Sequence, residues 1–317
     1  MRSLSRLALL LALVLLAGCV STGKAFNPPG GIATRASTIF VGDDCTESLL
    51  SFSATANGNV TPLTDVTGAA TGLADPYGLA YDRTTGNLWV SQGSGSVEEF
   101  SASATGNVAP LVTISGANTT FITPVPDAVD QNGNLYVDDQ DADTLDVFAK
   151  GSNGNVAPTR RITGLNAPEG VTVDSSGVTY VVNYSGDSIV EFAANANGAA
   201  TPIATISGAA TQVHGPFGIA LDSHGNVWVA DYSTNAILEF AKGANGNVAP
   251  ITVIQGAATT LSTPYGIAVD AKGYVYEDQQ GPQINVFSPG SSGNVAPSQV
   301  ISGVSTNLSC AISLAIR

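Results

Sequence analysis

The chain has 317 residues, of which 44% are hydrophobic and 11% are charged, and it contains 35 Gly and 16 Pro. This composition excludes a disordered chain and indicates a turn-rich globular protein with a large core. Eleven Lys and Arg against 25 Asp and Glu give a net charge of −14, which excludes a nucleic-acid partner, because binding to phosphates needs a basic face.

Residues 1–18 have the features of a secretory signal peptide. Two arginines precede an apolar run over residues 7–16, which is shorter than the roughly 20 residues that span a bilayer. The tetrapeptide Leu-Ala-Gly-Cys that ends at Cys19 resembles the lipobox of bacterial lipoproteins. The resemblance implies cleavage before Cys19, a lipid on its sulfur and a cell-envelope protein held at a membrane. Val20 stands where an Asp would retain the protein at the inner membrane, so an outer-membrane anchor is favoured.

Residues 19–35 show no periodicity and predict a flexible tether. If Cys19 carries the lipid, Cys45 and Cys310 remain as two thiols in an oxidising compartment. A disulfide between them is therefore expected.

Residues 36–317 consist of six repeated units of about 47 residues, which indicates a repeat fold. The string Gly-Asn-Val-Ala-Pro or a close variant begins at Gly58, Gly106, Gly154, Gly198, Gly246 and Gly293. These starts are 44 to 48 residues apart.

The unit that begins at Pro216 shows the expected strands most clearly. Residues 216–222 and 227–231 form two apolar strands around a turn, and residues 236–240 and 251–254 form two more. Four short strands in each of six units predict an all-β fold, a six-bladed β-propeller of four-stranded antiparallel blades.

The signature Pro-x-Gly-Ile-Ala-Val-Asp-x-x-Gly-Asn-x-Tyr-Val-Ala-Asp is nearly complete from Pro216 to Asp231 and partial in four other units. It resembles the NHL repeat, and the resemblance implies an NHL-type propeller over residues 36–317. The third strand lacks the Arg that many NHL units carry there. This departure and the acidic charge argue against the RNA-binding role of some NHL domains.

The two ends of the chain are expected to share one blade. Residues 39–41 match the second strand of a unit, and residues 314–316 match the missing first strand. In the repeat alignment Cys310 and Cys45 take positions that face each other across a hairpin, so their disulfide closes the ring.

Repeated and variable positions are expected to have different roles. Each unit but one has an Asp before a turn, and these carboxylates are expected to accept backbone N–H bonds; they are Asp82, Asp130, Asp174, Asp222 and Asp270. The Gly-Asn-Val-Ala-Pro segments are expected to be turns between third and fourth strands.

Variable residues at the end of the second strand and before the first strand are expected at one mouth of the central channel. The predicted ligand-binding residues are Tyr77, Glu169, Tyr184, Phe217, Tyr232, Tyr265, Gln92 and Gln279. Aromatic rings, amides and carboxylates suit a glycan, a peptide or an envelope protein. The alternative is that these side chains only pack the loops.

The same mouth carries hard oxygen ligands for a possible Ca²⁺ ion, namely Asp43, Asp139, Asn183 and Asp231, and a single candidate base, His214. The sequence has no second histidine at the mouth, and neither a Ser-His-Asp nor a Cys-His set can be assembled, because both remaining cysteines are expected to be oxidised. We therefore expect a membrane-anchored, non-enzymatic binding or scaffolding propeller. The alternative is a Ca²⁺-dependent lactonase-like hydrolase or an enzyme similar to streptogramin lyases.

Overall fold

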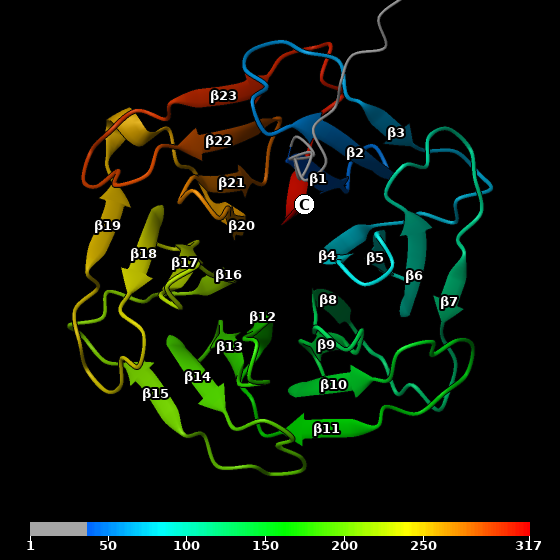
Figure 1. The fold of residues 1–317 in the computed structure, drawn as a ribbon, viewed down its shortest axis with the longest axis horizontal. Coiled ribbons are helices and arrows are strands. Elements are labelled where there is room, and N and C mark those ends of the chain that lie inside the picture. Colours follow the sequence, from blue (N-terminus) through cyan, green and yellow to red (C-terminus); the bar gives the residue numbers. More distant parts are fainter. Residues whose placement is uncertain (1–36) are drawn as a thin grey trace, which may run out of the picture. The chain divides into compact units, whose positions relative to one another are not determined.

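The computed structural model describes residues 37–317, apart from the side chains of residues 126 and 127. The expected signal peptide, Cys19 and the tether to residue 35 lie outside the described residues. The described chain forms six four-stranded antiparallel sheets that stand as blades around a central axis (Figure 1). Helical structure in this range is limited to the 3-10 helix η1 (Ala257–Thr259), so it contains no helix that could cross a membrane. The predicted fold class is confirmed.

Blade 1 is β24 (Ala311–Ile316), β1 (Thr38–Asp43), β2 (Ser48–Ser53) and β3 (Thr64–Val66); blade 2 is β4 (Pro76–Asp82), β5 (Asn87–Gln92), β6 (Ser96–Ser101) and β7 (Val112–Ile114). Blade 3 is β8 (Pro124–Val129), β9 (Leu135–Asp139), β10 (Thr144–Phe148) and β11 (Arg160–Thr163); blade 4 is β12 (Pro168–Val173), β13 (Thr179–Asn183), β14 (Ser188–Phe192) and β15 (Ala204–Ser207). Blade 5 is β16 (Pro216–Leu221), β17 (Val227–Asp231), β18 (Ala236–Phe240) and β19 (Thr252–Gln255); blade 6 is β20 (Pro264–Val269), β21 (Val275–Gln279), β22 (Gln283–Phe287) and β23 (Gln299–Ser302).

The core consists of apolar layers between neighbouring blades. In β1, Ile39 and Val41 pack against blade 6, whereas Phe40 points the other way and packs against blade 2. Both faces of each inner sheet are therefore buried, which explains why these strands are apolar at nearly every position rather than at every second one.

The ring closes where the two ends of the described chain meet. β1 pairs on one side with β2 and on the other with β24, so blade 1 combines both termini as expected. The disulfide between Cys45 and Cys310 is formed, with a Cα–Cα distance of 5.2 Å across 265 residues of sequence. The predicted closure of the ring is confirmed.

The Gly-Asn-Val-Ala-Pro loops join neighbouring blades. The N–H of Gly106, for example, donates to the carbonyl of Asp65 in blade 1, and the Asn107 side chain accepts the N–H of Ala70. The same Asn bond forms at five of the six blade junctions. At the sixth junction, between blades 3 and 4, Ala199 replaces the Asn. The connection between β11 and β12 is also shorter there than its equivalents, which accounts for the 44 residues between Gly154 and Gly198.

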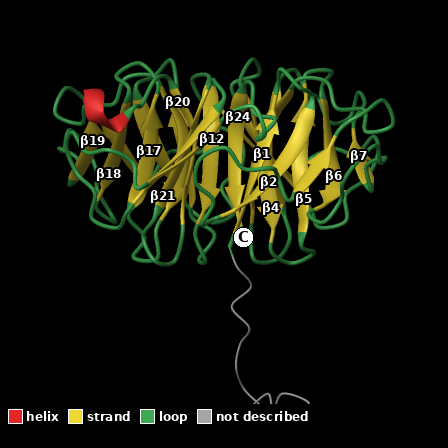
Figure 2. Cartoon of the chain, turned by 90° about the horizontal axis from the view of Figure 1, so that it is seen from above, coloured by secondary structure: helices red, strands yellow, loops and turns green. Residues whose placement is uncertain are grey.

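The molecule has two distinct faces (Figure 2). The turn face carries the hairpins between first and second strands, the Gly-Asn-Val-Ala-Pro loops and the start of β1. The mouth face carries the hairpins between second and third strands and the connections between blades. On the turn face Asp222 accepts the N–H groups of His224 and Asn226, and its equivalents form the same Asx turns, as predicted.

Candidate functional site

A β-bulge in the innermost strand directs side chains into the channel at the mouth face. In blade 5, Pro216 pairs with Asp231 and Ile219 pairs with Val229, so Phe217 and Gly218 stand together opposite a single residue of β17. The same register shift follows Pro76 in β4 and Pro264 in β20. Because a bulge changes the direction of the side chains beside it, the residue after each Pro reaches the channel axis.

Aromatic rings fill the mouth. Phe217 lies at the centre, with its ring centroid 4.1 Å from that of Tyr265, 5.0 Å from that of Tyr184 and 5.2 Å from that of Tyr232. Phe217 and Tyr265 are buried, whereas Tyr77, Tyr184 and Tyr232 are half-buried. The mouth therefore presents an aromatic platform with three partly open edges.

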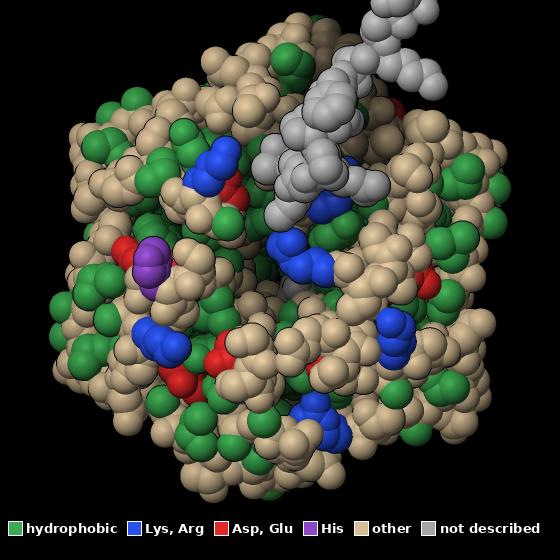
Figure 3. Space-filling view, in the orientation of Figure 1, with side chains coloured by type: hydrophobic (Ala, Val, Ile, Leu, Met, Phe, Trp, Pro, Cys, Tyr) green, Lys and Arg blue, Asp and Glu red, His purple; other side chains and the backbone are tan. Residues whose placement is uncertain are grey.

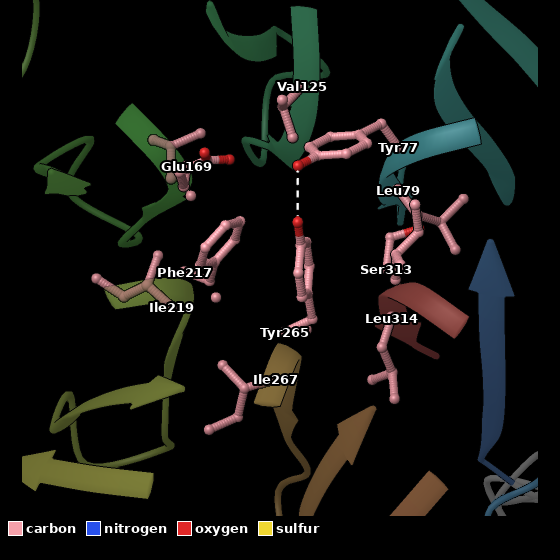
Figure 4. A pocket seen from close by; sticks show the side chains of 15 residues that line it. Tyr77, Leu79, Val125, Glu169, Phe217, Ile219, Tyr265, Ile267, Ser313 and Leu314 are labelled. Atoms are coloured by element: carbon pink, nitrogen blue, oxygen red, sulfur yellow. Dashed lines mark hydrogen bonds between the residues drawn. The ribbon is translucent and has the colours of Figure 1, made fainter. Parts of the chain in front are cut away.

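A small cavity lies on the channel axis below this platform (Figure 4). The hydroxyls of Tyr77 and Tyr265 hydrogen-bond at 2.7 Å across its top. Its volume is about 60 Å³, and its lower wall is formed by aliphatic side chains such as Ile219 and Ile267. The space admits a small chemical group and excludes a sugar ring, since ligand pockets for whole small molecules occupy roughly 300 to 1,000 Å³.

Glu169 gives the cavity a negative charge. It is 5% exposed, lines the cavity and accepts a hydrogen bond from the Gln140 side chain. Burial raises the pKa of Tyr77 to about 12, and the neighbouring charge of Glu169 acts on it in the same direction. The phenol of Tyr77 therefore lies within the electrostatic field of the carboxylate.

The predicted residues at the ends of the second strands have a structural role. In each blade the side chain accepts the backbone N–H of the residue two positions before the innermost strand. The acceptors are Asp43 (from Ser309), Gln92 (from Ala74), Asp139 (from Ile122), Asn183 (from Asn166), Asp231 (from His214) and Gln279 (from Ser262), at 2.6 to 3.0 Å. These side chains hold the connections between blades and do not line the cavity.

The four predicted Ca²⁺ ligands are therefore not brought together. Asp43, Asp139, Asn183 and Asp231 belong to four different blades, and each binds backbone N–H groups at its own junction. Among residues 37–317 no group of three or more His, Cys, Asp or Glu side chains could hold a metal ion. The alignment of the six repeats placed these residues at the correct face. It could not show that their side-chain oxygens accept hydrogen bonds from backbone N–H groups.

Neither histidine faces the central channel. The His214 side chain is 57% exposed, with Nδ1 3.8 Å from an Asp187 carboxylate oxygen, and it borders a separate pocket beside Gln212 and Thr234. His224 is 83% exposed on the turn face. The structure thus does not place His214 where it could act on a group bound in the mouth cavity.

Three buried or partly buried polar residues of the channel region and blade 6 were missed in the sequence. Gln140 holds Glu169, and no repeat position marked it. Glu277 and Asp278 are fully buried carboxyls of blade 6, and burial raises the pKa of both. A signal existed for Glu277, because the other five units have Val at its position: Val41, Val90, Val137, Val181 and Val229.

The other end of the channel is a well of about 230 Å³ that opens on the turn face. Aliphatic residues of the innermost strands line it, with Arg83 at its edge. Leu79, Ile219, Ile267 and Leu314 border both this well and the mouth cavity. These four side chains form an apolar waist between the two ends.

No protein-family model matches the chain, and no curated protein matches it either. Among solved structures, a protein of unknown function from Bacteroides caccae is 11% identical over 89% of this chain and 98% of that chain, with a TM-score of 0.64. A protein from Lactobacillus plantarum is 15% identical over 84% and 82% of the two chains, with a TM-score of 0.59.

A catalytically inactive variant of virginiamycin B lyase from Staphylococcus aureus, solved with quinupristin, is 16% identical to this chain, with a TM-score of 0.50. The match covers 67% of this chain and 66% of the lyase, slightly less than two thirds of the lyase's length. At these identities the comparisons show a shared propeller fold.

Proposed function

We propose that this protein is a lipid-anchored, NHL-type propeller of the bacterial cell envelope that binds a ligand at its aromatic mouth without chemical conversion. The observation that carries this proposal is the aromatic platform of Phe217, Tyr265, Tyr77, Tyr184 and Tyr232 above a small cavity. Tyr rings combine a large apolar surface with a polar tip, which suits reversible recognition of a glycan, a peptide or a partner protein.

The direction of the tether supports a mouth that faces away from the membrane. The described chain starts at the turn face with β1 (Thr38–Asp43), so its first residue lies on the side opposite the platform. Fully extended, residues 19–36 would reach at most about 65 Å. The loops of the turn face carry Arg83, Lys150, Lys242 and Lys272 among the Asx-turn aspartates (Figure 3), so basic groups on this face are available to anionic head groups.

The positions of the acid–base groups support binding rather than catalysis. His214 lies outside the mouth cavity, Cys45 and Cys310 are joined as a disulfide, and Glu169 is the acidic side chain on the cavity wall. A hydrolase or lyase needs a base and an electrophilic group within hydrogen-bond distance of one reacting atom.

Two measurements test the proposal. Mass spectrometry of the mature chain should find a diacylglycerol-modified Cys19, and Cys19→Ser should release the protein from membranes; an unmodified mature terminus would refute the anchor. In the second, saturation-transfer NMR with cellobiose and triglycine as probes should detect binding by the native chain that is lost in Tyr184→Ala/Tyr232→Ala. Identical spectra for native protein and variant would refute a binding role for the platform.

A further inference from the structure

We propose that the mouth cavity takes the head group of an organic cation, an alkylated ammonium. This inference rests on the proposed function, since it names the class of ligand for the same mouth. Three independent properties carry it: the size of the cavity, the charge of its wall and the distribution of charge between the two faces.

The size of the cavity selects a compact group. With the tyrosine hydroxyls joined, the cavity of about 60 Å³ is too small for a sugar ring and also for a trimethylammonium group, but the smaller cation needs less widening of the cavity. The rings of Tyr77, Phe217 and Tyr265 provide apolar and π surface on its upper side. A methylated ammonium is compact and weakly hydrated, and it is attracted to the faces of aromatic rings. Entry requires the hydrogen bond between the Tyr77 and Tyr265 hydroxyls to open.

The wall of the cavity is negative. The carboxylate of Glu169 and the two phenol oxygens line it, and its fifteen lining residues include no Lys, Arg or His. The Gln140 side chain that binds Glu169 supplies a neutral amide and no charge. A cation in the cavity would therefore lie beside a buried carboxylate, in surroundings that strengthen the attraction.

The mouth face is acidic apart from Arg161 of β11, whose guanidinium binds Thr119 and Thr120 in the connection before β8. Its loops contain Asp44, Glu47, Asp75, Asp141, Asp143 and Asp187 and, within the described residues, no Lys or Arg. The basic loop residues lie on the turn face instead. The excess of acidic side chains at the mouth lowers the local concentration of anions there and raises that of cations, which favours encounter with a positively charged ligand.

The test uses choline as the probe and 3,3-dimethyl-1-butanol as its neutral counterpart of the same shape, titrated calorimetrically into the full chain in detergent. We expect choline to bind at least about tenfold more tightly than the neutral alcohol, because the alcohol keeps the apolar contact and lacks the cation–π and carboxylate attraction. Raising the salt concentration should weaken choline binding further.

Glu169→Gln removes the charge with little change of shape and should weaken choline binding at least about fivefold without affecting the alcohol. The matched control is Asp174→Asn, which removes a carboxylate that follows the same strand, β12, on the turn face. At about 3.3 Å per residue the strand separates the two carboxylates by roughly 15 Å, which exceeds the screening length of about 10 Å. The control should therefore leave choline affinity within about twofold of that of the native protein.

Equal affinity of the two probes, or unchanged choline binding in Glu169→Gln, would overturn the cation inference and leave the binding mouth in place. Absence of choline binding while cellobiose or triglycine binds would have the same meaning. If none of these probes binds, the cation inference and the binding role both fail.

Discussion

Asp278 offers a sharp test of the electrostatics of this ring. Its side chain is fully buried in β21, where Oδ1 accepts the N–H of Gly266 at 2.7 Å and Oδ2 has no hydrogen-bond partner among the described residues. Burial raises the pKa of this carboxyl from 3.8 to about 7, and the charge of Asp43 adds to the increase. The folded protein therefore holds a proton on Asp278 at pH values where the unfolded chain has released it.

The sign of the effect follows from the proton count. Between pH 3.8 and about 7 the folded state binds more protons at Asp278 than the unfolded state, so stability falls as the pH rises through this window. A shift from 3.8 to about 7 corresponds to about 4 kcal/mol at about 1.4 kcal/mol per pKa unit, and the full penalty applies above pH 7.

Asp278→Asn keeps an oxygen that accepts the Gly266 N–H and removes the charge. We expect the variant to be about 2 to 4 kcal/mol more stable than the native protein at pH 8 and within about 1 kcal/mol of it at pH 4.5. Urea unfolding followed by the fluorescence of Trp89 and Trp228 measures both values. Equal differences at the two pH values, or lower stability of the variant at pH 8, would refute the reasoning.

Three further predictions concern the scaffold. Burial alone would raise the pKa of Asp222, but hydrogen bonds from backbone N–H groups, that of Asn226 above all, lower this pKa below 3.8. Asp222→Asn should therefore lower the free energy of unfolding at pH 7. In urea titrations, this difference from the native protein should disappear as the pH falls below 3.8. Replacing both Cys45 and Cys310 by Ser should lower the free energy of unfolding by about 4 to 5 kcal/mol in the same assay, and a loss under about 1 kcal/mol would contradict the role of the disulfide in closing the ring. Asn107→Ala should cost about 1 to 2 kcal/mol, measured as a lower urea midpoint, and an unchanged midpoint would show that the inter-blade bond contributes nothing.

The fold could be predicted because its information is periodic. The six Gly-Asn-Val-Ala-Pro segments and the alternation of short strands with turns specify both the number of blades and the strands of each one. The match of residues 314–316 to a first strand was sufficient to place both termini in blade 1, and the positions of Cys45 and Cys310 followed from the same alignment.

The candidate site could be predicted only in part. The alignment identified the face and the residues after each Pro, and Tyr77, Glu169, Phe217 and Tyr265 do line the cavity. It could not separate these from the ends of the second strands, because both sets vary in sequence. The β-bulge in the innermost strand and the path of the connections between blades decide the role of each side chain. They determine whether its oxygen faces the cavity or accepts a backbone N–H.

The sequence by itself determined the repeat, the blades, the disulfide and the acidic charge, because each follows from residue identity and spacing along the chain. Only the tertiary structure decided that Phe217 joins four tyrosines in one cluster, that Gln140 reaches Glu169, and that Asp278 loses contact with water. These contacts join residues of different blades, and their distances are set by how neighbouring sheets pack around the axis. No pattern within a single unit contains that information.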